Sequence, residues 1–497
     1  MRLAALLLCI ASLQAAEALP DWLAEAVAQK APSYPSKVRA VVLWKEEHVT
    51  VSPDGKRVMR ERGALRFLDN GSKSTRAFRT YNTKSGRIRD FEGWLVGPDA
   101  QVTKLGTKGS VQDVDLASNY SYTESRAKVM ECPRNIAKGS VFAWEIVEEE
   151  RSVFTQYLYS FQDDEPVLRS RFVLTTPPGW EVRGTLMNST DKLEPQQSGT
   201  TFTWEMRDLA WLPDEDYRPN THAIAPWLGV TYYPSGDAPA ALKPLATWTA
   251  VSEWLSGFMD PAAEPTAVIR TKASELAPSS ASFLDKLSAV ASLAQKTSYI
   301  SVQLNVTRGG GYTPHRAEEI LTRNYGDCKD KATLMRALLK AHGIDSYLVG
   351  VFSGDRDFVR RDWPSPMQFN HAILAVRVPD GVDSQAILSH PKLGRLWIFD
   401  PTDPYTPLGQ LPLEQQGSFA LVVAGAQGDL VKLPMMGPEQ NHIETEITGS
   451  IQPGASLKTR LVQTYSGDPA SRLRSVLSDD KALRNVFERV LAQRLGG

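Results

Sequence analysis

One cysteine lies where a glycine turn meets the start of a helix. Residues 325–334 read YGDCKDKATL, in which Gly326 supplies the turn and Asp327 is the expected N-cap. Apolar residues three and four positions apart predict a helix over residues 328–341. The positive end of that helix dipole favours a thiolate at Cys328. A thiolate is the nucleophile that acyl-transfer chemistry requires.

Two later segments could provide the partners of this thiolate. Residues 368–376 are expected to form a strand with His371 near its start, and residues 395–402 a strand that reaches Asp400. If the two strands pair, His371 and Asp400 lie side by side and face the helix. His371 would then take the thiol proton, and Asp400 would hold the imidazole in the correct tautomer.

The three motifs resemble the transglutaminase-like domain of secreted bacterial proteins, within the papain superfamily. They are Gly-Asp-Cys-Lys-Asp-Lys-Ala, Phe-Asn-His-Ala-Ile and Asp-Pro-Thr. The resemblance covers roughly residues 35–440 and implies an N-terminal β-rich domain of unknown function before the catalytic one. It also implies that Cys328 is the nucleophile, His371 the base and Asp400 the orienting partner of that base.

An acyl-transfer site also needs donors for the oxyanion. The backbone N–H of Cys328 is one, because the start of a helix leaves it free. Tyr299 and Gln303 precede the nucleophile in a strand-like segment, and either could provide the second donor. Trp363 lies in the polar loop 352–366 just before His371. It could cover the site or line an acyl pocket, or it could be an ordinary packed aromatic residue.

Neither a metal nor a cofactor is expected. No histidines, cysteines and carboxylates recur at the spacing of metal ligands. The glycine run at 309–311 has no following lysine–serine pair, so it is not a phosphate-binding loop.

The pattern along the chain predicts a multidomain α+β protein. Residues 35–240 show period-two strands broken by turn residues, which indicates an all-β sandwich. Residues 265–435 hold the motifs and form the expected transglutaminase-like α+β domain. Residues 440–497 begin with two alternating strands, 443–451 and 457–465, and end in a helix over 480–495. Two strands cannot bury a sandwich core alone, so we expect a partial β-rich segment of a truncated or split chain.

Composition and the first residues indicate the compartment. The net charge of −1 gives no reason to expect nucleic acid or an anionic membrane as a partner. Residues 1–18 resemble a secretory signal peptide in their charge, apolar run and small-residue cleavage site, with a short membrane anchor or a buried helix as the alternative. No other segment approaches 18 apolar residues, so the mature chain should have no membrane span. We therefore expect a periplasmic or secreted protein, in which Cys132 and Cys328 could also form a disulfide.

These features predict an exported cysteine-dependent enzyme that acts on amide bonds through a thioester on Cys328. It would be of the transglutaminase, deamidase or peptidase type, and its substrate would be a peptide or protein amide, with cell-wall peptide one choice. The alternative is a non-catalytic envelope protein that binds a peptide or glycan in the same cleft. The sequence decides neither between water and an amine as acceptor nor the oligomeric state.

Overall fold

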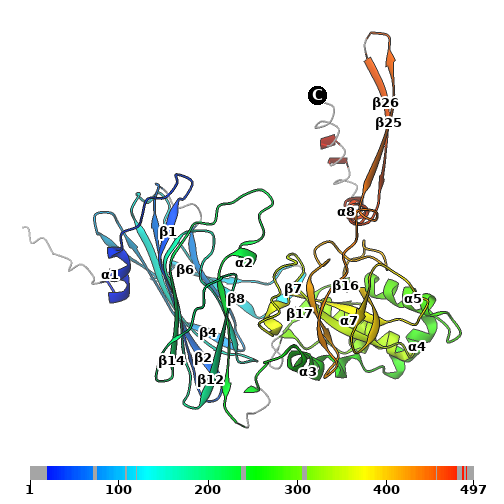
Figure 1. Ribbon diagram of the computed structural model, residues 1–497, viewed down its shortest axis with the longest axis horizontal. Coiled ribbons are helices and arrows are strands. Elements are labelled where there is room, and N and C mark those ends of the chain that lie inside the picture. Colours follow the sequence, from blue (N-terminus) through cyan, green and yellow to red (C-terminus); the bar gives the residue numbers. More distant parts are fainter. Residues whose placement is uncertain are drawn as a thin grey trace, which may run out of the picture. The chain divides into compact units, whose positions relative to one another are not determined.

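The computed structural model describes residues 19–70, 75–106, 109–118, 120–236, 242–304, 311–454, 456–477, 484–485 and 488–489. The expected signal peptide lies outside these residues. The chain forms two compact units, coloured along the sequence in Figure 1. The first takes in the described parts of Met1–Leu116, Ser125–Ser152 and Leu158–Leu228, and the second those of Ala117–Glu124, Val153–Tyr157 and Gly229–Gly497.

The first unit is built on an eight-stranded sheet. Its strand order is β13-β14-β11-β1-β2-β9-β4-β5, in which β1 and β11 run parallel while β1 and β2 form an antiparallel hairpin. A turn at residues 52–55 joins that hairpin. The strands are β1 (Ala40–Val51), β2 (Lys56–Phe67), β4 (Gly86–Val96), β5 (Val102–Leu105), β9 (Val141–Arg151), β11 (Val167–Thr175), β13 (Gln196–Ser198) and β14 (Thr201–Leu209).

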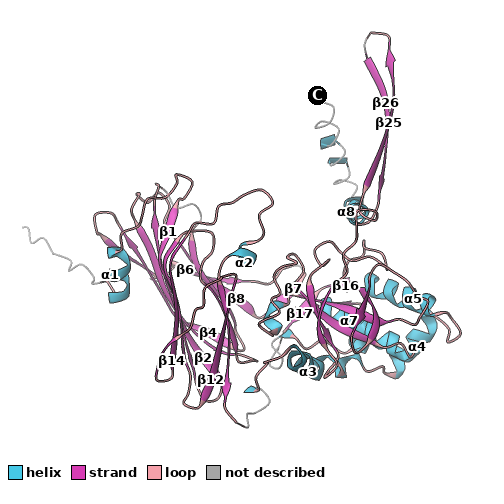
Figure 2. Ribbon diagram, in the orientation of Figure 1, coloured by secondary structure: helices cyan, strands magenta, loops and turns pink. Residues whose placement is uncertain are grey.

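Two three-stranded sheets and two helices complete the β-rich region (Figure 2). One sheet holds β3 (Arg76–Asn82), β8 (Ser125–Glu131) and β6 (Val111–Asp115), and the other β10 (Gln156–Ser160), β15 (Trp227–Pro234) and β12 (Trp180–Met187). Helix α1 (Asp21–Ala28) packs Trp22 against Trp44 of the large sheet, and α2 (Thr221–Ile224) is a single turn. The expected N-terminal β-rich domain is confirmed.

The second unit has an antiparallel six-stranded sheet and five helices around one apolar core. The strand order is β21-β22-β20-β19-β23-β24. The strands are β19 (Ser346–Val351), β20 (His371–Arg377), β21 (Ile387–His390), β22 (Gly394–Phe399), β23 (Phe419–Val423) and β24 (Asp429–Lys432). The helices are α3 (Trp248–Met259), α4 (Ala267–Leu276), α5 (Phe283–Lys296), α6 (Ala317–Arg323) and α7 (Cys328–Ala341). Together the units confirm a multidomain α+β protein.

Helices α3 and α4 occupy a stretch that the sequence predicts as a proline-interrupted boundary, residues 235–280. The oxygen of Thr247 caps α3 and that of Thr266 caps α4, each accepting from a backbone N–H three residues on. Pro261 lies in the short 3₁₀ turn Pro261–Ala263 between the two helices. Proline at such a position delimits a helix and does not break it, so the prolines separate these helices.

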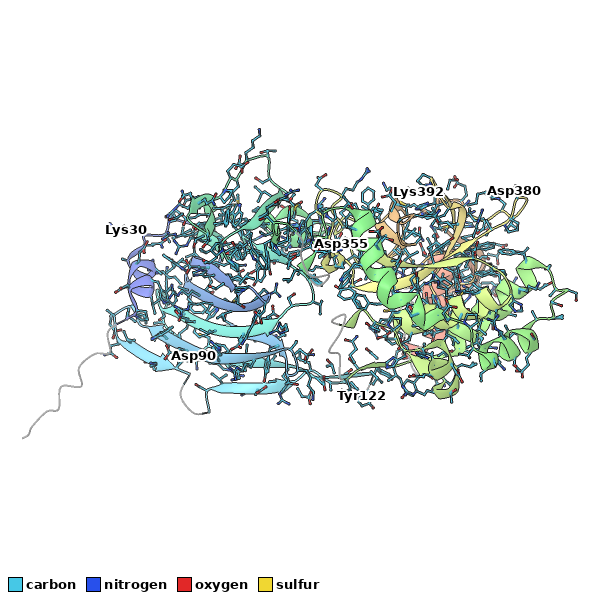
Figure 3. All side chains as sticks on the ribbon, turned by 90° about the horizontal axis from the view of Figure 1, so that it is seen from below. Lys30, Asp90, Tyr122, Asp355, Asp380 and Lys392 are labelled. Atoms are coloured by element: carbon cyan, nitrogen blue, oxygen red, sulfur yellow. The ribbon has the colours of Figure 1, made fainter. Side chains whose placement is uncertain are left out.

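Short strands connect the core of the second unit to the start of α7. β16 (Ser298–Tyr299) pairs in parallel with β18 (Tyr325–Gly326), and β17 (Ser301–Gln303) pairs with β7 (Ser121–Thr123). Tyr122, labelled in Figure 3, is the middle residue of β7 and lies opposite Val302. Residues 117–124 thus interrupt the first unit along the chain and belong to the second unit, where they add a strand beside the segment that leads to Cys328.

The C-terminal part is a hairpin followed by a helix. β25 (Ile443–Gln452) and β26 (Ser456–Tyr465) are the two expected strands, and α8 (Asp468–Leu477) follows them. Of the helix expected over 480–495, only residues 484–485 and 488–489 are described, and both pairs are helical. Within the described ranges, no helix has the length and apolar character needed to cross a membrane.

Candidate active site

Cys328 is the first residue of α7, and its position is fixed by a capping box. The carboxylate of Asp327 accepts from the backbone N–H of Asp330, and the carboxylate of Asp330 accepts from the N–H of Asp327. A Cβ on Gly326 would come within 2.5 Å of the Cβ of Asp330, so only glycine fits in this turn. The sequence therefore sets the helix start through one acidic pair and one close backbone approach.

Tyr299 lies directly beside the cysteine. The parallel pairing of β16 with β18 sets Tyr299 opposite Gly326, and its hydroxyl hydrogen-bonds both the side chain and the backbone of Cys328. Burial, together with the negative charges of Cys328 and Asp327, raises the pKa of Tyr299 well above its usual value. The phenol therefore keeps its proton at neutral pH and can act as a hydrogen-bond donor.

His371 and Asp400 meet because their strands are neighbours. β20 begins with His371 and pairs antiparallel with β22, and Asp400 directly follows β22. Nε2 of His371 lies 2.9 Å from Oδ2 of Asp400 and 3.4 Å from Oγ1 of Thr402. The imidazole also hydrogen-bonds the side chain of Cys328. Because Nε2 is engaged by Asp400, Nδ1 is the nitrogen left for the thiol.

The surroundings of His371 favour its protonated form. Burial by itself would lower the pKa of His371. The hydrogen bonds and negative charges of Asp400 and Cys328 outweigh that effect and raise the pKa to about 10. The structure thus holds a cation between a buried carboxylate and the cysteine sulfur.

Asp400 is 3% exposed and is held as an anion by several donors. Its Oδ1 accepts from the backbone N–H and the hydroxyl of Thr402, at 2.7 and 2.6 Å, and its Oδ2 accepts from Nε2 of Gln415 at 2.5 Å. Burial would raise the pKa of Asp400, but His371, Thr402 and Gln415 lower it below its usual value. Sequence reasoning missed Gln415, which comes from a loop with no local signal. Thr402 stands in the quoted Asp-Pro-Thr motif without an assigned role.

Charged residues around Cys328 are paired. Lys329 forms an ion pair with Asp327, and Nδ1 of His315 lies 3.0 Å from Oδ2 of Asp330. Lys331 is 1% exposed, and its ammonium donates to the carbonyl of Gln295, 3.2 Å away. Burial lowers the pKa of Lys331 to about 8, although the charges of Asp400 and Asp403 act in the opposite direction.

A cleft of about 290 Å³ opens beside Cys328 and His371. Its polar lining includes Tyr299 and Gln303, so the structure brings four of the six residues singled out from the sequence to one cavity. Asp400 lies behind His371 and is not among the lining residues. The remaining lining residues are Leu255, Met259, Ser301, Gly311, Tyr312, Asp327, Lys329, Leu348, Val349, Gly350, Phe369, Asn370, Ala372 and Val423.

Comparison with known families assigns both parts of the chain. Residues 270–382 match the transglutaminase-like superfamily, and residues 53–212 match a domain of unknown function with a solved structure, DUF3857. The chain joins a DUF3857 domain to a transglutaminase-like domain. No curated protein sequence matches the chain.

One solved structure has a similar fold over most of the chain. A "putative protease" from Parabacteroides distasonis ATCC 8503 is similar with a TM-score of 0.60 and 16% identity, over 84% of this chain and 78% of that chain. At that identity the likeness shows the fold alone. A "putative cysteine protease" from Cytophaga hutchinsonii shares 11% identity over 82% of this chain and 90% of that chain, with a TM-score of only 0.21.

Trp363 is a packed residue of the transglutaminase-like unit and does not line the cleft. It is 2% exposed, and its indole N–H lies 3.3 Å from the hydroxyl oxygen of Thr231. A Cβ on Gly229 would lie 2.3 Å from the Trp363 ring. Of the two interpretations open from the sequence, the structure places Trp363 as a packed aromatic residue.

Two further expectations from the sequence concern a disulfide and a metal site. Cys132 and Cys328 are not joined by a disulfide, and Cys132 is buried. Among the described residues, no three His, Cys, Asp or Glu side chains gather in a group that could hold a metal ion.

Proposed function

We propose that the transglutaminase-like unit is a cysteine-dependent enzyme that cleaves or transfers amide bonds. The observation that carries this proposal is the imidazole of His371, which contacts Cys328 while its Nε2 is held 2.9 Å from the buried Asp400 carboxylate. A cation fixed in this way favours the thiolate form of its neighbour. The superfamily match supports the same class of chemistry.

In the proposed reaction, Sγ of Cys328 attacks the carbonyl carbon of an amide. The imidazolium of His371 gives its proton to the leaving amine as the carbon–nitrogen bond breaks, and a thioester remains on Cys328. Water or a second amine then gives its proton to His371 while it attacks the thioester, which restores the thiolate–imidazolium pair. Asp400 stays ionised throughout and orients the ring. Water gives hydrolysis or deamidation, and an amine gives crosslinking.

The oxyanion of the tetrahedral intermediate needs two donors close to Cys328. The backbone N–H of Cys328 is one, and the hydroxyl of Tyr299 is the other that we propose, because it already hydrogen-bonds that side chain and backbone. The hydroxyl would turn from the sulfur to the developing oxyanion. Gln303 lines the same cleft and is the alternative donor.

The proposed substrate and compartment rest on the sequence. We propose a peptide or protein amide as substrate, with cell-wall peptide included, and a periplasmic or secreted location, because residues 1–18 have the pattern of a signal peptide. A mature protein recovered from the periplasm or medium, with its N-terminus sequenced, would test the location.

The first experiment is the pH dependence of alkylation at Cys328 by iodoacetamide, in wild type and in His371→Ala. The label is located by mass spectrometry, and buried Cys132 serves as the internal control. We expect rapid labelling of Cys328 far below the usual thiol pKa of about 8.5, and loss of this rapid labelling in the His371 variant. Slow labelling of Cys328 at the same rate in wild type and in His371→Ala would refute the catalytic pair and favour the non-catalytic binding protein.

The second experiment looks for turnover with a library of peptide amides. Released ammonia or amine reports cleavage, and added hydroxylamine should trap the acyl group as a hydroxamate. Cys328→Ala should abolish both signals, while Cys132→Ala should keep them. Turnover that survives in Cys328→Ala would contradict a thioester on this cysteine.

A further inference from the structure

Part of the cleft lining is apolar, although Cys328 and His371 line the same cleft. Leu255 and Met259 lie one turn apart on α3, so they share one helix face. Leu348 of β19 pairs with Val423 of β23, and both line the cleft beside these two helix residues. All four are at most 6% exposed. They form an apolar floor, which is the name used below for Leu255, Met259, Leu348 and Val423.

Two aromatic rings that also line the cleft are held in place by further rings. Phe369 packs over Gly350, where an added Cβ would come within 3.1 Å of the Phe369 ring. The ring of Trp248 also packs against Phe369, with 5.8 Å between the two ring centroids. The Tyr312 ring lies 5.4 Å from Trp254, and the Tyr312 hydroxyl donates to the carbonyl of Pro366. Rings fixed in this way make a preformed pocket, because little side-chain freedom remains to be lost on binding.

The charges in the cleft are already neutralised. Asp327 is ion-paired with Lys329, and His371 is ion-paired with Asp400. The amide of Asn370 is engaged by Ser353, with its oxygen accepting and its nitrogen donating. A charged substrate group would lose its hydration here and meet no opposite charge. An apolar group would gain by leaving water.

We infer that the apolar floor is a specificity pocket for an aliphatic or aromatic side chain adjacent to the reacting carbonyl. The cavity volume of about 290 Å³ is near the lower end of small-ligand pockets, roughly 300–1,000 Å³. It suits one large side chain beside the carbonyl. This inference rests on the proposed function, because it takes Cys328 as the reacting group.

The test uses reagents that react with Cys328 whether or not the protein turns over a substrate. Iodoacetamide is compared with its N-isobutyl, N-benzyl, N-carboxymethyl and N-aminoethyl derivatives, and each rate is normalised to the rate with a small thiol in solution. We expect the two apolar reagents to label Cys328 at least about tenfold faster than the two charged ones, the size of effect that one or two methylene groups have in an apolar pocket.

Substitutions on α3 locate the effect. Met259→Asp should remove about tenfold of the preference, measured in each variant as the ratio of the apolar-reagent rate to the charged-reagent rate. Gly257→Asp is the matched control, because Gly257 is an exposed position on the same helix and a Cβ there meets nothing within 4 Å. If Met259→Asp does not fold, the reagent series on wild type still decides the inference.

The outcomes separate the two proposals. Fast, His371-dependent labelling by iodoacetamide without a preference for apolar reagents would overturn the specificity pocket and leave the proposed function intact. Equal loss of preference in Met259→Asp and Gly257→Asp would also overturn the pocket. Slow labelling by every reagent, regardless of His371, would overturn the proposed function and this inference with it.

Discussion

Replacing Asp400 by asparagine should weaken the Cys328–His371 pair without removing the side chain's shape. The partners of His371 raise its pKa from an ordinary 6.5 to about 10. At about 1.4 kcal/mol for each pKa unit, they favour the imidazolium by about 5 kcal/mol. The hydrogen bond that His371 donates to Asp400 is the largest favourable contribution. If it provides about half, its loss costs about 2–3 kcal/mol, or roughly two pKa units.

The assay is the pH titration of the His371 ring by NMR, in which the pKa should fall from about 10 in wild type to about 8 in Asp400→Asn. Asp403→Asn is the matched control. The carboxylate of Asp403 lies in the same turn but accepts from the N–H of Tyr405 and the hydroxyl of Thr406, not from His371. A folded Asp400→Asn protein whose His371 keeps the wild-type pKa would refute the role of this carboxylate.

Three further predictions concern unfolding free energies measured with urea. Burial lowers the pKa of Lys331 to about 8, so between about pH 8 and pH 10.5 the unfolded chain binds more protons than the folded one. Wild type therefore gains stability as the pH rises through this window. The difference in unfolding free energy by which Lys331→Met exceeds wild type should shrink over the same window. His315→Ala should cost about 1–3 kcal/mol near pH 5.5, and less as pH rises, because its bond to Asp330 raises the pKa of His315. Gly229→Ala should cost about 1–3 kcal/mol through its clash with Trp363, and Trp363→Leu should recover part of that loss.

Local patterns were enough to predict the elements that hold the reacting residues. The helix expected over residues 328–341 matches α7, and the strand pairing expected around His371 and Asp400 occurs between β20 and β22. Both depend on short-range signals: a capping residue, apolar spacing and β-branched runs. The chemical roles of Cys328, His371 and Asp400 stay predictions until the labelling experiments are done.

Features that depend on tertiary contacts could not be predicted from the sequence. Gln415 reaches Asp400 from a loop with no periodic pattern, so nothing near it indicates the contact. Trp363 has the same local signature whether it lines a cleft or packs in a core, and only its burial beside Gly229 separates the two. Helices α3 and α4 were missed because the prolines around them dominate the local pattern, although the threonine caps are present.

The charges that flank the nucleophile explain why α7 is positioned so exactly. Asp327, Lys329, Asp330 and Lys331 are all buried, although buried charges are costly unless they are paired. Asp327 and Lys329 pair with each other, which leaves two charges that must find partners elsewhere.

Those two charges reach separate parts of the transglutaminase-like unit. Asp330 hydrogen-bonds His315, which precedes α6. Lys331 donates to the carbonyl of Gln295 on α5, and the charge of nearby Asp400 acts on the pKa of Lys331. Moving the start of α7 would leave at least one buried charge without its partner, at a cost of several kcal/mol. The same contacts that stabilise the helix therefore hold Cys328 at a fixed distance from His371. A substitution at Lys331 should for that reason change the labelling of Cys328 as well as stability.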